Sequence, residues 1–324
     1  MNALLVGFFG EGNLGDEAIL QGVLQTLPSS RRLLVTAGRH RPVSGPLYLP
    51  RQGLLAWHQF IQSLPTCRHL WFAGGILQDW SFAGTTFFGL RVLAAHHLGR
   101  TPGFWGAGIG PLHRRASRRF VKRVLRYPDP VWLRDQQSVD LYHTLTGRQA
   151  HLGADWSWAL EPTVTPRASA VAGRLGLNLR PWFNPDCEEH VRLLLGNRLQ
   201  TSSLCGISAR PEDSRLIRQM VSGIEIFSFE SFSELLSIAT HLREGWAMRY
   251  HVVLAMLRAN LPTIPLPYDE KVRALCEEAG IPLPADPGQA PFVACRPATD
   301  FPRRLQQRFQ SMRAAFLAEL EKDS

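Results

Sequence analysis

Two residues with useful chemistry, Arg249 and His251, lie close together in the second half of the chain. They follow a strand-like run at residues 246–248 and precede an apolar segment at 252–257 that has helical character. The first turn of a helix offers backbone N–H groups to anions, and histidine titrates near neutral pH. The pattern predicts an anion site with a titratable group beside it. The same residue types also serve as ordinary surface and core residues at helix starts. These two residues alone therefore do not establish a functional site.

A glycine-rich loop follows the first predicted strand, residues 3–7, and leads into a helix with an apolar face. The loop glycines that match the spacing of a dinucleotide-binding fingerprint are Gly10, Gly12 and Gly15. Asp16 and Glu17 place two negative charges in the first helical turn, where a pyrophosphate would have to lie. The acidic residue that would hold a ribose is missing, although Arg39 could meet a 2′-phosphate. An NADP site therefore remains a minor alternative.

Five further strand-like runs follow in the first half of the chain, separated by segments with helical apolar spacing. They are residues 32–37, 69–73, 103–106, 130–133 and 150–153. Such alternation predicts a parallel sheet with helices on both faces, and ligands of these sheets bind outside the carboxyl ends of the strands. The glycines and polar residues expected at that edge are Gly12, Asn13, Asp16, Gly74, Gly75, Asp79 and Arg134. Their shared placement predicts a binding cleft.

A proline-rich connection at residues 161–167 interrupts the pattern, and the strand-helix alternation then begins again. Its strand-like runs are residues 175–179, 204–209, 224–229, 246–248 and 263–266. We expect an α/β protein with two Rossmann-like domains facing a cleft. The predicted division is an N-terminal domain at 1–162, a C-terminal domain at 168–300 and a terminal helix at 301–324.

The composition narrows the class of protein. The net charge of +9 comes almost wholly from arginine, and no acidic residue occurs between Glu17 and Asp79. Three explanations compete: a bias toward arginine in the coding composition, a field that attracts anionic small molecules or anionic lipid head groups, and nucleic-acid binding. Nucleic acid is the weakest of these alternatives because no base-reading motif is present. We therefore expect no nucleic-acid partner.

No apolar run reaches the roughly 18 residues that a membrane span requires. The first residues lead directly into a strand-like run, without the features of a secretory signal. The five cysteines are widely spaced and contain no C-x-x-C pair. We expect a soluble cytoplasmic protein with reduced thiols and no metal site.

Seven motifs, taken together and in order, resemble the polysaccharide pyruvyl transferase family, most closely the bacterial enzymes that modify cell-wall or surface polymers. They are Gly-Asn-Leu-Gly-Asp-Glu at 12–17, Gly-Gly-Ile-Leu-Gln-Asp at 74–79, Gly-x-Gly-Ile-Gly-Pro at 106–111, Arg-Asp-x-x-Ser at 134–138, Asn-Leu-Arg-Pro-Trp at 178–182, Met-Arg-Tyr-His at 248–251 and Tyr-Asp-Glu-Lys-Val at 268–272. The resemblance implies a glycosyltransferase-B-like fold. It also implies phosphoenolpyruvate as donor, a saccharide with two suitably placed hydroxyls as acceptor and a pyruvyl ketal as product.

The resemblance also implies roles for individual residues. Arg249 and Arg180 would bind the donor, and His251 would transfer a proton or contact the phosphate. The residues that would line the cleft on the other side and bind substrate are Gly12, Asn13, Asp16, Gly74, Gly75, Asp79 and Arg134. No cofactor is implied, because phosphoenolpyruvate is a substrate. The sequence departs from the family at Tyr250, where leucine is usual, and at Ala73, where glycine is usual.

Two other functions stay open at this point. The chain could be a nucleotide-sugar-dependent glycosyltransferase of the same fold, in which Arg249 and His251 would bind a diphosphate. It could also be a non-catalytic protein that binds a saccharide or an anion. If it is a pyruvyltransferase, its basic charge would favour a lipid-linked acceptor and peripheral contact with the inner membrane surface.

Overall fold

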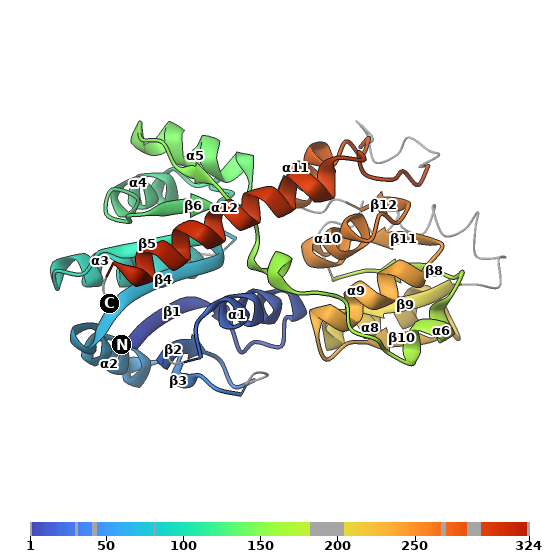
Figure 1. Cartoon of the computed structure of the whole chain (residues 1–324), viewed down its shortest axis with the longest axis horizontal. Coiled ribbons are helices and arrows are strands. Elements are labelled where there is room, and N and C mark those ends of the chain that lie inside the picture. The colour runs from blue at the N-terminus through green and yellow to red at the C-terminus, as the bar shows by residue number, and fades with distance from the viewer. Residues whose placement is uncertain are drawn as a thin grey trace. The chain divides into compact units, whose positions relative to one another are not determined.

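The computed structural model describes residues 2–29, 32–40, 44–80, 82–181, 204–266, 270–283 and 293–322. The chain forms two compact units, and strands alternate with helices in each (Figure 1). Unit 1 is Met1–Leu160 with Arg304–Ser324, and unit 2 is Glu161–Arg303. The motif residues Trp182, Tyr268 and Asp269 lie outside the described residues.

Unit 1 contains a parallel sheet of seven strands in the order β3-β2-β1-β4-β5-β6-β7. The strands are β1 (Asn2–Phe9), β2 (Arg32–Ala37), β3 (Leu47–Pro50), β4 (Cys67–Ile76), β5 (Pro102–Ile109), β6 (Val131–Leu133) and β7 (His151–Leu152). The helices are α1 (Leu14–Thr26), α2 (Leu54–Ser63), α3 (Phe82–His97), α4 (Arg115–Val124) and α5 (Gln136–Thr146). Parallel strands need crossover connections, which these helices supply.

The middle strands explain why the sequence shows continuous apolar runs here. Every residue of β5 is buried, and so is most of β4, because helices cover both faces of the sheet. The rings of Phe72 and Phe104 lie 5.6 Å apart in the core between these two strands and the helices. The edge strand β3 was not predicted. It is short and partly exposed, and Pro50 can belong to it because an edge strand tolerates proline.

The terminal helix α12 (Phe301–Glu321) packs against unit 1, where Figure 1 shows it in red passing β4 and β5. The Phe316 ring lies 4.6 Å from Trp71, 5.1 Å from Trp105 and 5.0 Å from Trp156, measured between ring centroids. All four aromatic side chains are buried. The helix therefore completes the aromatic core of unit 1, although the chain reaches it only after passing through unit 2.

Unit 2 contains a second parallel sheet, of five strands in the order β10-β9-β8-β11-β12. The strands are β8 (Leu175–Asn178), β9 (Leu204–Ser208), β10 (Ile226–Ser228), β11 (Glu244–Ala247) and β12 (Thr263–Pro265). The helices are α6 (Arg167–Val171), α8 (Pro211–Met220), α9 (Phe232–His241), α10 (Tyr250–Arg258) and α11 (Glu270–Glu278). Two parallel sheets with alternating helices confirm the predicted α/β class.

The core of unit 2 lies around the central strands β8 and β11. Leu177, Trp246 and Ile264 are almost fully buried and pack in one cluster. The helices of the described residues include none that is long and apolar enough to cross a membrane. The contacts divide the chain after Leu160, and the residues from Arg304 onward belong to unit 1.

Candidate functional site

The junction of β11 and α10 in unit 2 has the geometry that the sequence pattern predicts. Arg249 has an extended backbone (φ −74°, ψ 132°) and stands as the N-cap of α10. Its backbone N–H donates to Oδ1 of Asn178 over 3.0 Å, and Nδ2 of Asn178 donates to the carbonyl of Ile207 over 2.9 Å. The buried Asn178 side chain thus ties together the carboxyl ends of three neighbouring strands, β8, β9 and β11.

The Arg249 side chain is buried and held by an aspartate that sequence reasoning missed. Nε and Nη2 of Arg249 donate to the two carboxylate oxygens of Asp213 over 2.6 and 2.5 Å. Nη2 also lies 3.3 Å from Oε1 of Glu212. Asp213 is on the first turn of α8 and has 0% exposure. Burial raises the pKa of the Asp213 carboxyl, and the hydrogen bonds from Arg249 oppose that shift.

His251 and Arg180 lie at the same edge of the unit 2 sheet. The His251 ring, in the first turn of α10, is half-buried and meets Phe232 and Tyr250 edge to face, with centroid distances of 6.2 and 5.1 Å. The backbone N–H of Arg180 donates to Sδ of Met248 over 3.4 Å. Residues from the ends of β8 and β11 therefore come together, as the sequence predicts for a parallel sheet.

In unit 1 the glycine loop after β1 meets the end of β4. Asn13 caps α1 through its Oδ1, which accepts from the Gly15 N–H, and its Nδ2 donates to Oδ2 of Asp16. Gly74 has a φ of +82°, and a Cβ there would lie 3.9 Å from Oδ1 of Asp16. Gly12, with a φ of +66°, completes the turn. The structure thus brings Gly12, Asn13, Asp16 and Gly74 together.

Glu17 occupies the position in this loop where a phosphate would need free N–H groups. Its Oε1 accepts from the Gly10 N–H over 2.7 Å. Burial raises the pKa of this carboxyl to about 7; the Gly10 hydrogen bond opposes the shift and the neighbouring Asp16 adds to it. A carboxyl group that already holds the loop N–H argues against a dinucleotide site despite the matching glycines. The position of Glu17 in the loop motif was the only feature of the sequence that pointed to this residue.

Asp79 holds the loop after β5 in place. Its Oδ2 accepts from the backbone N–H of Arg114 over 2.7 Å, and its own N–H donates to the Pro111 carbonyl over 3.2 Å. Burial acts to raise the pKa of Asp79, but the backbone N–H groups of Arg114 and His113 outweigh it and hold that pKa below its usual range. Asp79 therefore has a loop-supporting function in this structure, separate from the Asn13 and Asp16 group.

Arg134 is likewise an internal residue. Its Nη1 lies 3.1 Å from Oδ2 of Asp155, and its Nε lies 3.3 Å from Oδ2 of Asp135. The guanidinium covers the backbone of Gly108 so closely that a Cβ there would lie 2.6 Å from Nε. The side chain connects the ends of β5, β6 and β7.

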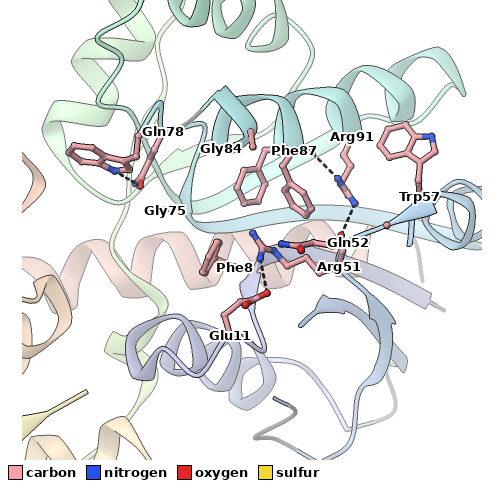
Figure 2. A pocket seen from close by; sticks show the side chains of 14 residues that line it. Phe8, Glu11, Arg51, Gln52, Trp57, Gly75, Gln78, Gly84, Phe87 and Arg91 are labelled. Atoms are coloured by element: carbon pink, nitrogen blue, oxygen red, sulfur yellow. Dashed lines mark hydrogen bonds and ion pairs between the residues drawn. The ribbon is translucent and has the colours of Figure 1, made fainter. Parts of the chain in front are cut away.

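Gly75 lines a cavity of about 720 Å³ in unit 1, which Figure 2 shows from close by. Two arginines in its wall, Arg51 and Arg91, were not predicted as site residues. The sequence signal was the acid-free interval between Glu17 and Asp79, which contains Arg51. Within the part of the chain that the structure describes, no three His, Cys, Asp or Glu side chains gather in a way that could hold a metal ion.

Comparison with solved structures identifies the fold. UDP-GlcNAc 2-epimerase from Neisseria meningitidis bound to UDP-GlcNAc aligns with 99% of this chain and 100% of its own, at 11% identity and a TM-score of 0.64. Anabaena HepE in complex with UDP-glucose aligns over the same shares at 10% identity and a TM-score of 0.60. The chain thus has the glycosyltransferase-B-like fold that the sequence predicts. At these identities the likeness shows the fold alone.

Sequence comparison supplies the family. No curated protein sequence matches the chain. The profile described as polysaccharide pyruvyl transferase matches residues 13–270, which include every predicted site residue except Gly12. The match covers most of the chain and indicates a transferase, so the non-catalytic alternative falls away. The chain therefore belongs to the polysaccharide pyruvyl transferase family.

Proposed function

We propose that the protein transfers the enolpyruvyl group of phosphoenolpyruvate to two hydroxyls of a saccharide and forms a pyruvyl ketal in cell-wall or surface polysaccharide synthesis. In this reaction one hydroxyl loses its proton as its oxygen bonds to C2, and C3 gains a proton. Phosphate then leaves, and the second hydroxyl oxygen bonds to C2 and loses its proton. The site must therefore bind a carboxylate and a phosphate and move protons.

The observation that carries this proposal is the convergence of Arg180, Arg249 and His251 at the carboxyl edge of the unit 2 sheet. The N-terminus of α10 adds backbone N–H groups that favour an anion. His251 is the proposed proton-transfer group, since imidazole titrates near neutral pH. Asp213 fixes the orientation of the Arg249 guanidinium.

Two acids, Glu212 and Asp213, hold the Arg249 guanidinium. Arg210 lies 3.2 Å and Arg249 3.3 Å from Oε1 of Glu212, and Arg249 also pairs with Asp213. These two arginines and two acids sum to no net charge. Arg180 brings a second guanidinium to the same edge of the sheet, and Arg249 contributes directed hydrogen bonds.

The test is the melting temperature of the purified protein with and without millimolar phosphoenolpyruvate. A ligand at 100 times its dissociation constant stabilises the folded state by about 2.7 kcal/mol. Arg180→Gln should remove that rise, whereas Arg243→Gln, at an exposed position of the same unit, should keep it. His251→Asn should keep donor binding but slow phosphate release with a competent acceptor by about a hundredfold or more. An unchanged response in Arg180→Gln would contradict the donor assignment.

A nucleotide-sugar glycosyltransferase is the second candidate, because the structural neighbours named above carry UDP-GlcNAc or UDP-glucose. In that case UDP-sugars should raise the melting temperature and phosphoenolpyruvate should have no effect. The same thermal assay therefore decides between the two donors.

We also infer that the acceptor is lipid-linked and that the protein acts at the inner membrane face. One face of α4 and the residue before it carry six exposed cations: Arg114, Arg115, Arg118, Arg119, Lys122 and Arg123. Each cation near an anionic surface contributes about 1 kcal/mol. The protein should sediment with vesicles that contain phosphatidylglycerol and remain in solution with phosphatidylcholine alone. A triple change of Arg118, Arg119 and Lys122 to glutamine should release it.

A further inference from the structure

The cavity of about 720 Å³ in unit 1 lies where three parallel strands end. Phe8 and Glu11 come from the end of β1, Arg51 from the residue after β3, and Gly75 from the end of β4. Helix α3 closes another side with Phe87, Phe88 and Arg91. Figure 2 shows Arg51 between Phe8 and Phe87, with Gln78 toward one end of the cavity and Trp57 toward the other. Both the position and the volume are those of a small-molecule site.

Arg51 is an almost fully buried cation that uses little of its hydrogen-bonding capacity. It is 7% exposed, and its Cζ lies 3.9 Å from the centre of the Phe8 ring and 4.7 Å from that of Phe87. Nη1 donates to Oε1 of Glu11 over 2.8 Å. Nε is buried without a partner, and Nη2 donates to no acceptor among the described residues. A guanidinium has five N–H donors, so Arg51 can bind a further acceptor.

Arg91 adds a second positive charge to the cavity wall, next to Arg51. It is 5% exposed, and it donates from Nη1 to the Phe87 carbonyl over 2.9 Å and from Nη2 to the Arg51 carbonyl over 3.1 Å. Burial, and then the positive charge of Arg51, lower the pKa of Arg91 to about 10. Glu11 is the only acid among the described residues that line the cavity, and its side chain is 31% exposed. Two buried cations thus face one partly solvated carboxylate.

The rest of the lining suits a sugar ring. Aromatic side chains form much of the wall: Phe8, Trp57, Trp80, Phe87 and Phe88. Aromatic faces pack well against the apolar side of a flat ring ligand. Gln52 and Gln78 offer amide groups to hydroxyls, and Oε1 of Gln78 already accepts from Nε1 of Trp80 over 3.2 Å. The cavity therefore combines a positive end with aromatic and amide surfaces.

We propose that this cavity binds the acceptor saccharide through an oxyanion that the acceptor carries, a phosphate or a carboxylate, held by Arg51. The sugar ring lies against the aromatic wall. This inference rests on the proposed pyruvyl transfer, because it names the acceptor class of that reaction. The proposal predicts that the cavity prefers anionic saccharides to neutral ones. An anionic saccharide would pair with the two arginines, whereas a neutral one would leave the excess positive charge uncompensated.

The test is the melting temperature of the full chain with millimolar galactose 1-phosphate, galacturonate, galactose or inorganic phosphate. At least one anionic sugar should stabilise the protein, and galactose and inorganic phosphate should do so much less. The anionic sugar that gives the larger rise in melting temperature shows whether the oxyanion of the acceptor is a phosphate or a carboxylate. Arg51→Gln should weaken binding of the anionic sugar by about tenfold or more. Equal shifts with galactose, or with inorganic phosphate, would overturn the proposal, and so would the absence of any shift.

Two controls distinguish a failure of the cavity assignment from a failure of the donor assignment. The phosphoenolpyruvate response of each variant reports on the proposed donor site, which Arg51 does not form. A protein that binds phosphoenolpyruvate but no anionic sugar would disprove the cavity assignment alone, whereas the opposite result would disprove the donor assignment alone. If Arg51→Gln fails to fold, Gln78→Ala supplies a second variant. It should weaken sugar binding without affecting the donor, and unchanged sugar binding would overturn the proposal.

Discussion

Arg249 in unit 2 and Arg51 in unit 1 are both 7% exposed, and both follow the carboxyl end of a strand. Arg249 meets both oxygens of a carboxylate that has no solvent exposure. Arg51 meets one oxygen of Glu11, which is partly solvated. A buried arginine is therefore not in itself an anion site. The burial and geometry of its partner decide how much positive charge remains for a ligand.

Glu17 extends the comparison to a buried acid. Asp213 is buried with a cation as its partner, whereas Glu17 is buried with the Gly10 N–H as a hydrogen-bond donor and Asp16 as a like-charged neighbour. The result is a carboxyl group whose pKa rises to about 7. Among the described residues no cation pairs with Glu17, whereas Arg249 opposes the effect of burial on the pKa of Asp213.

The largest effect is expected when the paired arginine loses its partner. Asp213→Asn leaves the positive charge of Arg249 buried and should lower the free energy of unfolding by about 3–5 kcal/mol. Urea unfolding followed by circular dichroism measures the change in the free energy of unfolding. Glu277→Gln, at an exposed position of the same unit, is the control and should stay within about 0.5 kcal/mol of the unchanged protein. A loss no larger than in the control would mean that the pair does not neutralise Arg249.

The next effect depends on pH and concerns Glu17. The folded-state pKa is raised from 4.5 to about 7, so the stability that Glu17 contributes is full below pH 4.5 and is lost as pH rises through 7. Glu17→Gln carries no such proton and keeps an oxygen for the Gly10 N–H. Relative to the unchanged protein, the variant should gain about 2–3 kcal/mol of stability between pH 5 and pH 8. Parallel stability curves would show that Glu17 titrates normally.

The smallest effect is expected at Glu11. Glu11→Gln removes a partly exposed partner of Arg51 and should cost no more than about 1 kcal/mol of stability. It also raises the net positive charge of the cavity, so the affinity for the anionic sugar that binds should rise by about fivefold. Thermal titration measures both quantities. Weaker binding in this variant would indicate that Glu11 contacts the ligand directly, contrary to the charge argument.

The sequence was informative about the fold because its strands are apolar runs ended by glycine, proline or polar residues. The β11–α10 junction at Arg249 is such a case, and its place at the sheet edge follows from parallel topology. Strand β3 and helix α2 were not predicted. The strand is only four residues long and ends in Pro50, and periodicity carries little information over so short a run.

Charge pairing was not predictable in the same way. Asp213 lies 36 positions before Arg249, and Glu11 lies 40 positions before Arg51. In the sequence Asp213 has the position of an ordinary first-turn acid that complements a helix dipole. Only the contact between the first turn of α8 and Arg249, which follows β11, reveals that Asp213 neutralises an arginine. Residue types at a sheet edge can thus be predicted, whereas the state of their charges depends on contacts between distant segments.

The packing of α12 on unit 1 sets an order for folding during synthesis. Chains fold from the N-terminus as they are made, but Trp71, Trp105 and Trp156 receive Phe316 only from the last helix. Unit 2 is synthesised completely before that helix exists, so it can finish folding while unit 1 still exposes an apolar face. On the ribosome, the first part of the chain to be made is therefore the last to be completed.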